Sequence, residues 1–156
     1  MSDRYFFKQE VYDELVEQLR SMKGPEKTQV QKDISAARAQ GDLSENAEYH
    51  ASRERLSMLM TKIQDLESKL ANSEVYDPAE RPKGQIFVGS NITIENLDSG
   101  VILEGEVVSM PLFKDGVVEI STKSPVGKAI LGKSVGDEVT VKSERGINRW
   151  LIKKVD

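Results

Sequence analysis

The stretch Gly41-Asp-Leu-Ser-Glu-Asn-Ala-Glu-Tyr-His50 decides the fold, because it forms a short polar turn between two long amphipathic segments. The segment after the turn carries an apolar seam at Leu56, Leu59, Ile63, Leu66 and Leu70. The segment before the turn carries a second seam at Tyr12, Leu15, Leu19 and Met22, which continues after a gap at Val30, Ile34 and Ala37. Alternating spacings of three and four residues are typical of coiled-coil helices. Two such helices joined by a tight turn hide their seams by packing antiparallel.

The first arm of this predicted hairpin contains the pair Gly24-Pro25. A proline inside a helix removes one backbone hydrogen bond and clashes with the preceding turn. We therefore expect a kink or a short break at this point of the arm. The second arm runs for about 25 residues from the turn to Leu70, which corresponds to roughly 38 Å of helix.

Composition changes near residue 80. No glycine lies between Gly41 and Gly84, whereas nine follow from Gly84 onward. The segment Asp77-Pro-Ala-Glu-Arg-Pro-Lys-Gly84 has the prolines and charges of a linker. We therefore predict a coiled-coil hairpin over residues 1–77, a linker over 78–84 and a second domain over 85–156.

The second domain has the pattern of a small β-sheet. Its β-rich segments are 91–96, 101–108, 117–121, 139–141 and 150–152. Ser124 and Pro125 are suited to cap and begin one short helix, because serine favours the N-cap and proline the first turn. We expect Phe113 and Trp150 in the core. The predicted class is α+β, with a helical hairpin followed by an antiparallel sheet and one short helix.

The composition excludes several functions. The chain has no cysteine, so disulfides, thiolate zinc sites and cysteine nucleophiles are excluded. No apolar run approaches the roughly 18 residues that cross a bilayer, so we expect a cytoplasmic protein without membrane contact. The formal net charge of −4 makes the surface as a whole repel nucleic acid. Any contact with nucleic acid must be local or delivered by a partner.

Asp42 and Glu45 are the candidate metal ligands. Carboxylates displayed at the end of a helical rod suit a hard cation such as Mg²⁺, which takes one or two protein ligands and completes its shell with water or phosphate. Two carboxylates are too few for a complete site, so we expect half of a metal site. The alternative is a capping box, because Asp-x-x-Glu before a helix also satisfies free backbone N–H groups.

The tip motif and the segment Ser124-Pro-Val-Gly-Lys-Ala-Ile-Leu-Gly-Lys-Ser-Val-Gly-Asp137 resemble the bacterial Gre transcript-cleavage factors, GreA more than GreB. The resemblance implies that the coiled coil enters the secondary channel of RNA polymerase as a monomeric accessory factor, not an enzyme. It also implies an FKBP-like second domain that docks at the channel rim on the β′ subunit. Asp42 and Glu45 would then help to hold Mg²⁺ in the polymerase active site, where backtracked nascent RNA is hydrolysed.

The resemblance also implies roles for four other residues. Arg38 and Arg53 would contact the RNA 3′ segment, since guanidinium groups suit phosphate. The alternative is that both are solvated helix charges. Ser124 and Pro125 lie in the neighbourhood that docks on the polymerase, while also starting their helix.

Two other functions compete with this one. One is a channel-occupying regulator that inhibits RNA polymerase without promoting cleavage, although such relatives carry a more acidic tip. The other is a peptidyl-prolyl isomerase with a helical extension, which needs an aromatic-lined pocket. Residues 78–156 contain only Phe87, Phe113 and Trp150 as aromatic side chains. The single histidine, His50, has no nucleophile or metal-ligand spacing around it, so we expect it and Tyr49 to pack or form hydrogen bonds at the tip.

Overall fold

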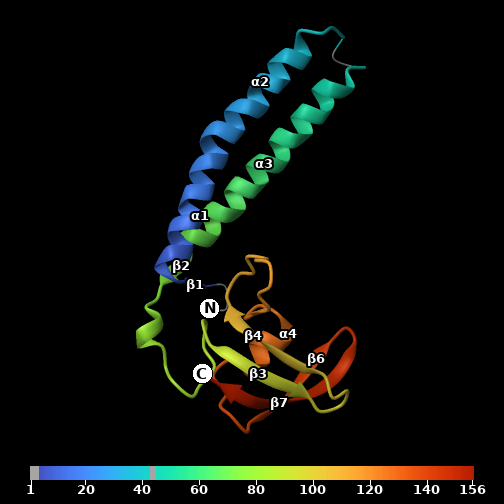
Figure 1. Ribbon diagram of the computed structural model, residues 1–156. Helices are drawn as coiled ribbons and strands as arrows, with labels where there is room; N and C mark the ends of the chain where they lie inside the picture. The colour runs from blue at the N-terminus through green and yellow to red at the C-terminus, as the bar shows by residue number, and fades with distance from the viewer. Residues whose placement is uncertain (1–3, 43–44) are drawn as a thin grey trace. The chain divides into compact units, whose positions relative to one another are not determined.

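The computed structural model describes residues 4–42 and 45–156, which form two compact units (Figure 1). One unit is Gln9–Ser73, and the other combines Glu74–Asp156 with the described part of Met1–Lys8. The second unit therefore includes residues 4–8 and 74–77, which were predicted to belong to the hairpin. Within the described residues, no helix has both the length and the apolar character needed to span a membrane.

The unit Gln9–Ser73 is a helical hairpin, as predicted. Its first arm consists of α1 (Gln9–Ser21), a π-helical turn (Met22–Glu26) and α2 (Lys27–Arg38). Its second arm is α3 (Ala47–Ala71), and Figure 1 shows α2 and α3 side by side. The π-helical turn contains Pro25, so the irregularity expected at Gly24-Pro25 is confirmed. A π turn accommodates the missing N–H donor without ending the arm.

The two apolar seams of the hairpin pack against each other. The buried side chains of the arms include Leu15, Met22, Ala37, Leu59, Ile63 and Leu66. Two ion pairs join the arms outside the seam: Lys23 Nζ lies 2.8 Å from Glu67 Oε2, and Arg55 Nη2 lies 3.5 Å from Asp33 Oδ2. These pairs lie between turns of the two arms that face each other, in the register that the packed seams impose.

The other unit contains a five-stranded sheet with the order β5-β4-β3-β7-β6. The strands are β3 (Asn91–Asn96), β4 (Ile102–Val108), β5 (Glu119–Ser121), β6 (Glu138–Ser143) and β7 (Gly146–Val155). The pairs β4–β3, β3–β7 and β7–β6 are antiparallel, whereas the edge strand β5 pairs with β4 in parallel. The prediction of an antiparallel sheet with one short helix is thus confirmed, with a single parallel edge strand added.

The short helix α4 (Pro125–Ile130) covers one face of this sheet. Ser124 is its N-cap, and Ser124 Oγ accepts a hydrogen bond of 3.0 Å from the Gly127 N–H. A Cβ atom on Gly127 would collide with the carbonyl oxygen of Ser121, so only glycine fits at this close approach. Ile130 is fully buried and joins the sheet residues in the core.

The prediction that Phe113 lies in the core is wrong. Its side chain is 87% exposed, and its backbone has a φ of 55°, in the left-handed region that non-glycine residues rarely adopt. The Glu119 carboxylate accepts hydrogen bonds from the N–H groups of Leu112 at 2.7 Å and Lys114 at 3.4 Å. These bonds shape a turn that points Phe113 outward. Trp150 is half-buried and packs against the core, in line with its prediction.

Candidate functional site at the hairpin tip

The turn between α2 and α3 is organised by Asn46. Its side-chain oxygen accepts a hydrogen bond of 3.0 Å from the Tyr49 N–H, which makes Asn46 the N-cap of α3. Its side-chain nitrogen donates a bond of 2.6 Å to the Ala37 carbonyl oxygen near the end of α2. Asn46 therefore closes the turn from both sides. The capping-box alternative, in which Asp42 caps the second helix, is wrong because Asn46 occupies the cap position.

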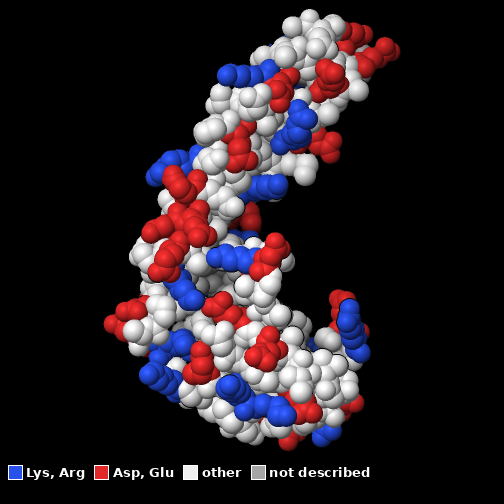
Figure 2. Space-filling model, viewed as in Figure 1, with Lys and Arg blue, Asp and Glu red and all other residues white. Residues whose placement is uncertain are grey.

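Asp42 and Glu45 are both exposed on this turn, and the residues between them lie outside the described part of the chain. Figure 2 shows several acidic side chains near the turn that joins α2 to α3. Among the described residues, no three His, Cys, Asp or Glu side chains come together in a way that could hold a metal ion. Exposed carboxylate oxygens are suitable ligands for Mg²⁺, but this pair alone provides only part of its coordination shell.

Behind the carboxylates, two guanidinium groups flank one tyrosine ring. The Cζ atoms of Arg38, at the end of α2, and Arg53, on α3, lie 5.8 Å and 5.7 Å from the centroid of the Tyr49 ring. Both distances are within the range of a cation–π interaction. Tyr49 is buried, with 7% of its surface exposed. The ring of His50 packs against it edge-on at 5.5 Å, which agrees with the packing role expected for His50.

The two guanidinium groups also act on the phenolic oxygen of Tyr49. Hydrogen bonding from Arg38 lowers the pKa of the Tyr49 phenol, and the positive charge of Arg53 adds to this effect. Both arginines border a groove of about 560 Å³ on one side of the hairpin, here called the tip groove. It is lined by Gln31, Ile34, Ser35, Arg38, Tyr49, Arg53 and Leu56.

Arg55 differs from these two arginines. It lies on the opposite side of the hairpin, where its Nη2 donates a hydrogen bond of 2.9 Å to Ser52 Oγ and pairs with Asp33 at 3.5 Å. Arg38 and Arg53 form no ion pair with an acidic side chain among the described residues. The tip groove therefore presents two guanidinium groups that have no ion-pair partner among the described carboxylates.

Both arginines were predicted from the sequence, whereas Tyr49 was expected to pack or form hydrogen bonds at the tip. The spacing of four residues from Tyr49 to Arg53 places them on one face of a helix, and this signal was available. The approach of Arg38 from the other arm depends on the register of the hairpin, which the sequence pattern alone does not give.

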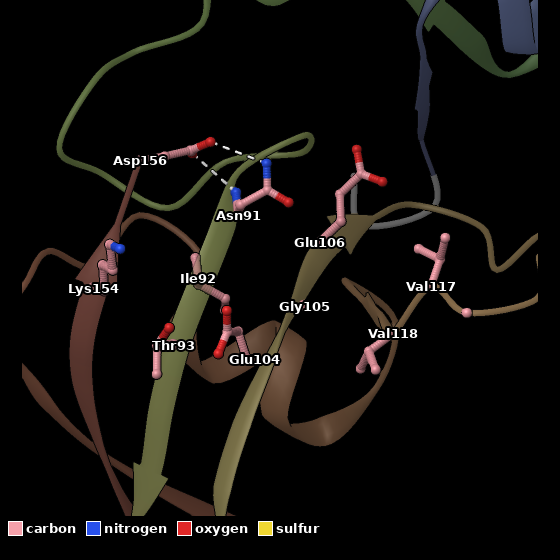
Figure 3. Close-up of a pocket in the computed structure, with 11 residues that line it drawn as sticks. Asn91, Ile92, Thr93, Glu104, Gly105, Glu106, Val117, Val118, Lys154 and Asp156 are labelled. Atoms are coloured by element: carbon pink, nitrogen blue, oxygen red, sulfur yellow. Dashed lines mark hydrogen bonds between the residues drawn. The ribbon is translucent and has the colours of Figure 1, made fainter.

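A second hollow lies in the sheet unit, beside β3 and β4 (Figure 3). Its volume is about 450 Å³, and its walls include the exposed valines Val117 and Val118. Two of its carboxylates are already paired: Glu106 with Lys8 at 3.1 Å, and Asp156 with Arg81 at 3.0 Å. No aromatic side chain is among the described residues that line it. This hollow therefore lacks the aromatic pocket that the peptidyl-prolyl isomerase alternative requires.

Comparison with known proteins places both units in one class. Residues 6–75 match the family description "Transcription elongation factor, N-terminal", and residues 81–156 match "Transcription elongation factor, GreA/GreB, C-term". These two matches together define the chain as a transcription elongation factor.

Relatives from two bacteria are similar over nearly the whole chain. The transcription elongation factor GreA of Chlorobaculum parvum is 40% identical over 94% of this chain and 92% of its own length. GreA of Helicobacter hepaticus is 38% identical over 92% of this chain and 88% of its own. The crystal structure of GreA factor homolog 1 of Thermus thermophilus matches with a TM-score of 0.47 at 22% identity, over 98% and 99% of the two chains. The chain belongs to the GreA/GreB family of transcription elongation factors.

Proposed function

We propose that this chain stimulates the Mg²⁺-dependent cleavage of backtracked nascent RNA by bacterial RNA polymerase. The hairpin tip would enter the secondary channel of the polymerase. The sheet unit would dock at the channel rim on the β′ subunit, through a surface that includes Ser124 and Pro125. Membership in the GreA/GreB family over both units supports this proposal.

One observation at the tip carries the proposal. Asp42 and Glu45 are exposed on a turn whose helix cap is made by Asn46, so Asp42 is not needed as the cap of α3. Exposed carboxylates at this end of the hairpin can reach an ion that is held mainly by another molecule. Since two carboxylates provide too few ligands for a stable site, the chain acts as an accessory factor and hydrolyses no RNA by itself.

Each group at the tip has a distinct task in this proposal. Asp42 and Glu45 supply oxygen ligands to Mg²⁺, which when bound activates water and stabilises charge on the phosphate. Arg38 and Arg53 hold phosphates of the extruded RNA 3′ segment, because planar guanidinium groups pair with phosphate oxygens. The rigid arms bring all four side chains to one end of the hairpin, and such placement provides much of the benefit of a catalytic site.

The test uses a stalled, backtracked elongation complex with labelled RNA. We expect the wild-type chain to accelerate release of the RNA 3′ fragment. Asp42→Asn and Glu45→Gln should each lower this acceleration by about 100-fold, similar to removing one electrostatic group from an active site. Both variants should still compete with the wild type for polymerase. Glu54→Gln, which removes an exposed carboxylate of α3 away from the turn, is the matched control and should behave as the wild type.

Two outcomes would contradict the proposal. Cleavage of free RNA without polymerase would show that the chain is itself a nuclease. A wild-type chain that binds polymerase and slows RNA synthesis, yet releases no 3′ fragment, would favour the inhibitory regulator instead.

A further inference from the structure

We infer that Tyr49 is a positioning residue, which holds Arg38 and Arg53 so that both guanidinium groups address phosphates of the same RNA segment. This inference rests on the proposed function and adds a residue to it. Tyr49 does not touch the RNA in this arrangement, because its surface is almost fully buried. It acts through the two arginines that lie against its ring.

The geometry of the two arms supports this role. Arg38 is the last residue of α2, and Arg53 is one helical turn beyond Tyr49 on α3. Both side chains are exposed, and an unrestrained arginine samples many rotamers that binding must freeze. The shared ring, at 5.8 Å and 5.7 Å from the two Cζ atoms, restricts both side chains to the tip groove. Groups held in their bound arrangement bind more tightly, because less freedom is lost.

The charge at the groove supports the same role. An acidic side chain between the two arginines would also hold them, but it would neutralise the charge that attracts phosphate. A tyrosine offers its ring face and one neutral oxygen that accepts hydrogen bonds. The distances from both Cζ atoms to the ring carry this argument, and the pKa of the Tyr49 phenol, lowered by hydrogen bonding from Arg38 and by the charge of Arg53, agrees with it. Tyr49 therefore orients the arginines and leaves their positive charge available.

The Tyr49 ring is itself fixed to the turn. The Tyr49 N–H donates to the Asn46 cap, and the ring contacts His50. Asn46 in turn binds Ala37, the residue before Arg38. One continuous set of contacts therefore connects the turn that carries the carboxylates with both arginines. A change at the ring should disturb the arginines while leaving the carboxylates on their turn.

The experiment compares Tyr49→Leu, which removes the ring and the oxygen, with Tyr49→Phe, which keeps the ring. Leu59→Ala is the control for reduced packing, because Leu59 is buried in the seam outside the tip groove. Arg55→Gln is the control for removal of an arginine on the opposite side. The first measurement, on the free full-length chain, is the NMR resonances of the Arg38 and Arg53 side-chain N–H groups.

A ring close to both guanidinium groups should shift these resonances away from those of a flexible arginine. The shift should persist in Tyr49→Phe and in Leu59→Ala but disappear in Tyr49→Leu. Resonances that match a flexible arginine in the wild type would overturn the positioning of the two side chains. This result does not depend on polymerase, so it separates failure of the inference from failure of the proposed function.

The second measurement is the concentration of factor that gives half-maximal RNA cleavage, as a function of salt. Tyr49→Leu should raise this concentration about tenfold, the size expected for weakened bonds to charged groups. The logarithm of this half-maximal concentration is plotted against the logarithm of salt concentration. The slope of that plot should fall by about 0.7 for each phosphate of single-stranded RNA that an arginine no longer neutralises. Leu59→Ala and Arg55→Gln should keep the wild-type slope, and Tyr49→Phe should lie closer to the wild type than Tyr49→Leu.

A mutant cycle completes the test. If Tyr49 positions Arg53, then Arg53→Gln should raise the half-maximal concentration about tenfold in the wild type but less than about threefold in the Tyr49→Leu background. The reason is that the effects of substitutions at contacting residues are not additive. An unchanged salt slope in Tyr49→Leu, or simple additivity in the cycle, would overturn the inference. A wild-type chain that stimulates no cleavage at all would overturn the proposed function instead.

Discussion

At the scale of single residues, Asn46 connects the two arms through two hydrogen bonds of one amide group. Asn46→Ala removes both bonds and should lower the free energy of unfolding by about 1 kcal/mol or more, the usual cost of removing an N-cap. Asn46→Asp is the informative partner, because it keeps the oxygen that accepts from Tyr49 but cannot donate to Ala37. In thermal unfolding, the stability of Asn46→Asp should lie between the stabilities of the wild type and Asn46→Ala. Equal stability of all three chains would contradict the role of the cap.

Asp98 should contribute to the stability of the sheet unit in a pH-dependent way. The Arg149 N–H donates a hydrogen bond of 2.8 Å to its Oδ2, and this bond lowers the pKa of the Asp98 carboxyl below its ordinary value of 3.8. Because the folded state binds this proton less readily than the unfolded state, the contribution is present above pH 3.8 and is lost as the pH falls below it.

Urea unfolding at several pH values between about 2 and 6 would measure this effect, since that range spans the ordinary pKa of a carboxyl group. Asp98→Asn should lose part of the pH dependence of the free energy of unfolding. Arg149→Gln should lose less, because it retains the backbone N–H that provides the main contact. Identical pH profiles for the wild type and Asp98→Asn would show that this carboxyl does not link folding to pH.

The residues that sequence reasoning placed correctly have local signals. Ser124 and Pro125 start α4 because capping depends on neighbours three residues away. The prediction that Phe113 lies in the core was wrong for a different reason. Its apolar character suggested burial, but two hydrogen bonds to Glu119 impose a turn that directs it to solvent. Those bonds depend on the folded loop, so hydrophobicity alone led to the wrong result.

At the scale of elements, the long periodic segments were predicted, whereas two short strands were missed. The seam of α3 repeats over many turns, and the strand over residues 91–96 was placed with its observed bounds. The strands β1 (Tyr5–Phe7) and β2 (Ser73–Val75) have three residues each, too few for a periodic pattern. The parallel pairing of β5 with β4 also carries no sequence signal, since strand direction follows from the path of the connecting loop.

The length of the arms provides a test of the proposed function. Deleting residues 27–33 from α2 and 56–62 from α3 removes one heptad at matching heights and keeps both seams in phase. The hairpin should still fold, but it becomes about 10 Å shorter. Misplacement of active groups by an ångström can cost about 100-fold in rate. We therefore expect polymerase binding without stimulated cleavage, even at excess protein.

Circular dichroism would confirm that this shortened chain keeps its helices, and competition with the wild type would confirm binding to polymerase. The matched control carries substitutions within residues 27–33 and 56–62 only at exposed positions and keeps full length. Near-normal cleavage by the well-folded short variant would contradict direct action of the tip at the catalytic centre.

At the scale of the whole molecule, the hairpin is inserted into the chain of the sheet unit. Residues 4–8 belong to the same unit as residues 74–156. The Phe6 N–H donates to Ser109 Oγ at 2.9 Å, the Ser109 hydroxyl donates back to the Phe6 carbonyl oxygen at 2.8 Å, and Lys8 pairs with Glu106. These bonds join residues 103 and 98 positions apart, which explains why a sequence boundary based on composition assigned the first residues to the hairpin.

Because the hairpin is an insertion, the sheet unit can be isolated by deleting the hairpin from the chain. A chain in which a short Gly-Ser turn replaces residues 9–72 retains β1, β2 and the contacts of Phe6 and Lys8. A fragment beginning at residue 78 lacks them and leaves the polar atoms of Ser109 without their partners, which costs stability. Chemical unfolding should therefore show the hairpin-deleted chain to be more stable than the fragment. Equal stability of the two would contradict a structural role for residues 4–8.

The same hairpin-deleted chain tests whether the sheet unit binds RNA polymerase while the hairpin supplies the metal ligands. We expect it to compete with the full-length protein for RNA polymerase, because the proposed docking surface at Ser124 and Pro125 is intact. It should inhibit the cleavage that the full-length protein stimulates, because it lacks Asp42 and Glu45 and supplies no metal ligand. Ser124→Ala with Pro125→Ala in this chain is the control and should compete less. If the folded hairpin-deleted chain fails to compete at all, the main affinity for polymerase resides in the hairpin.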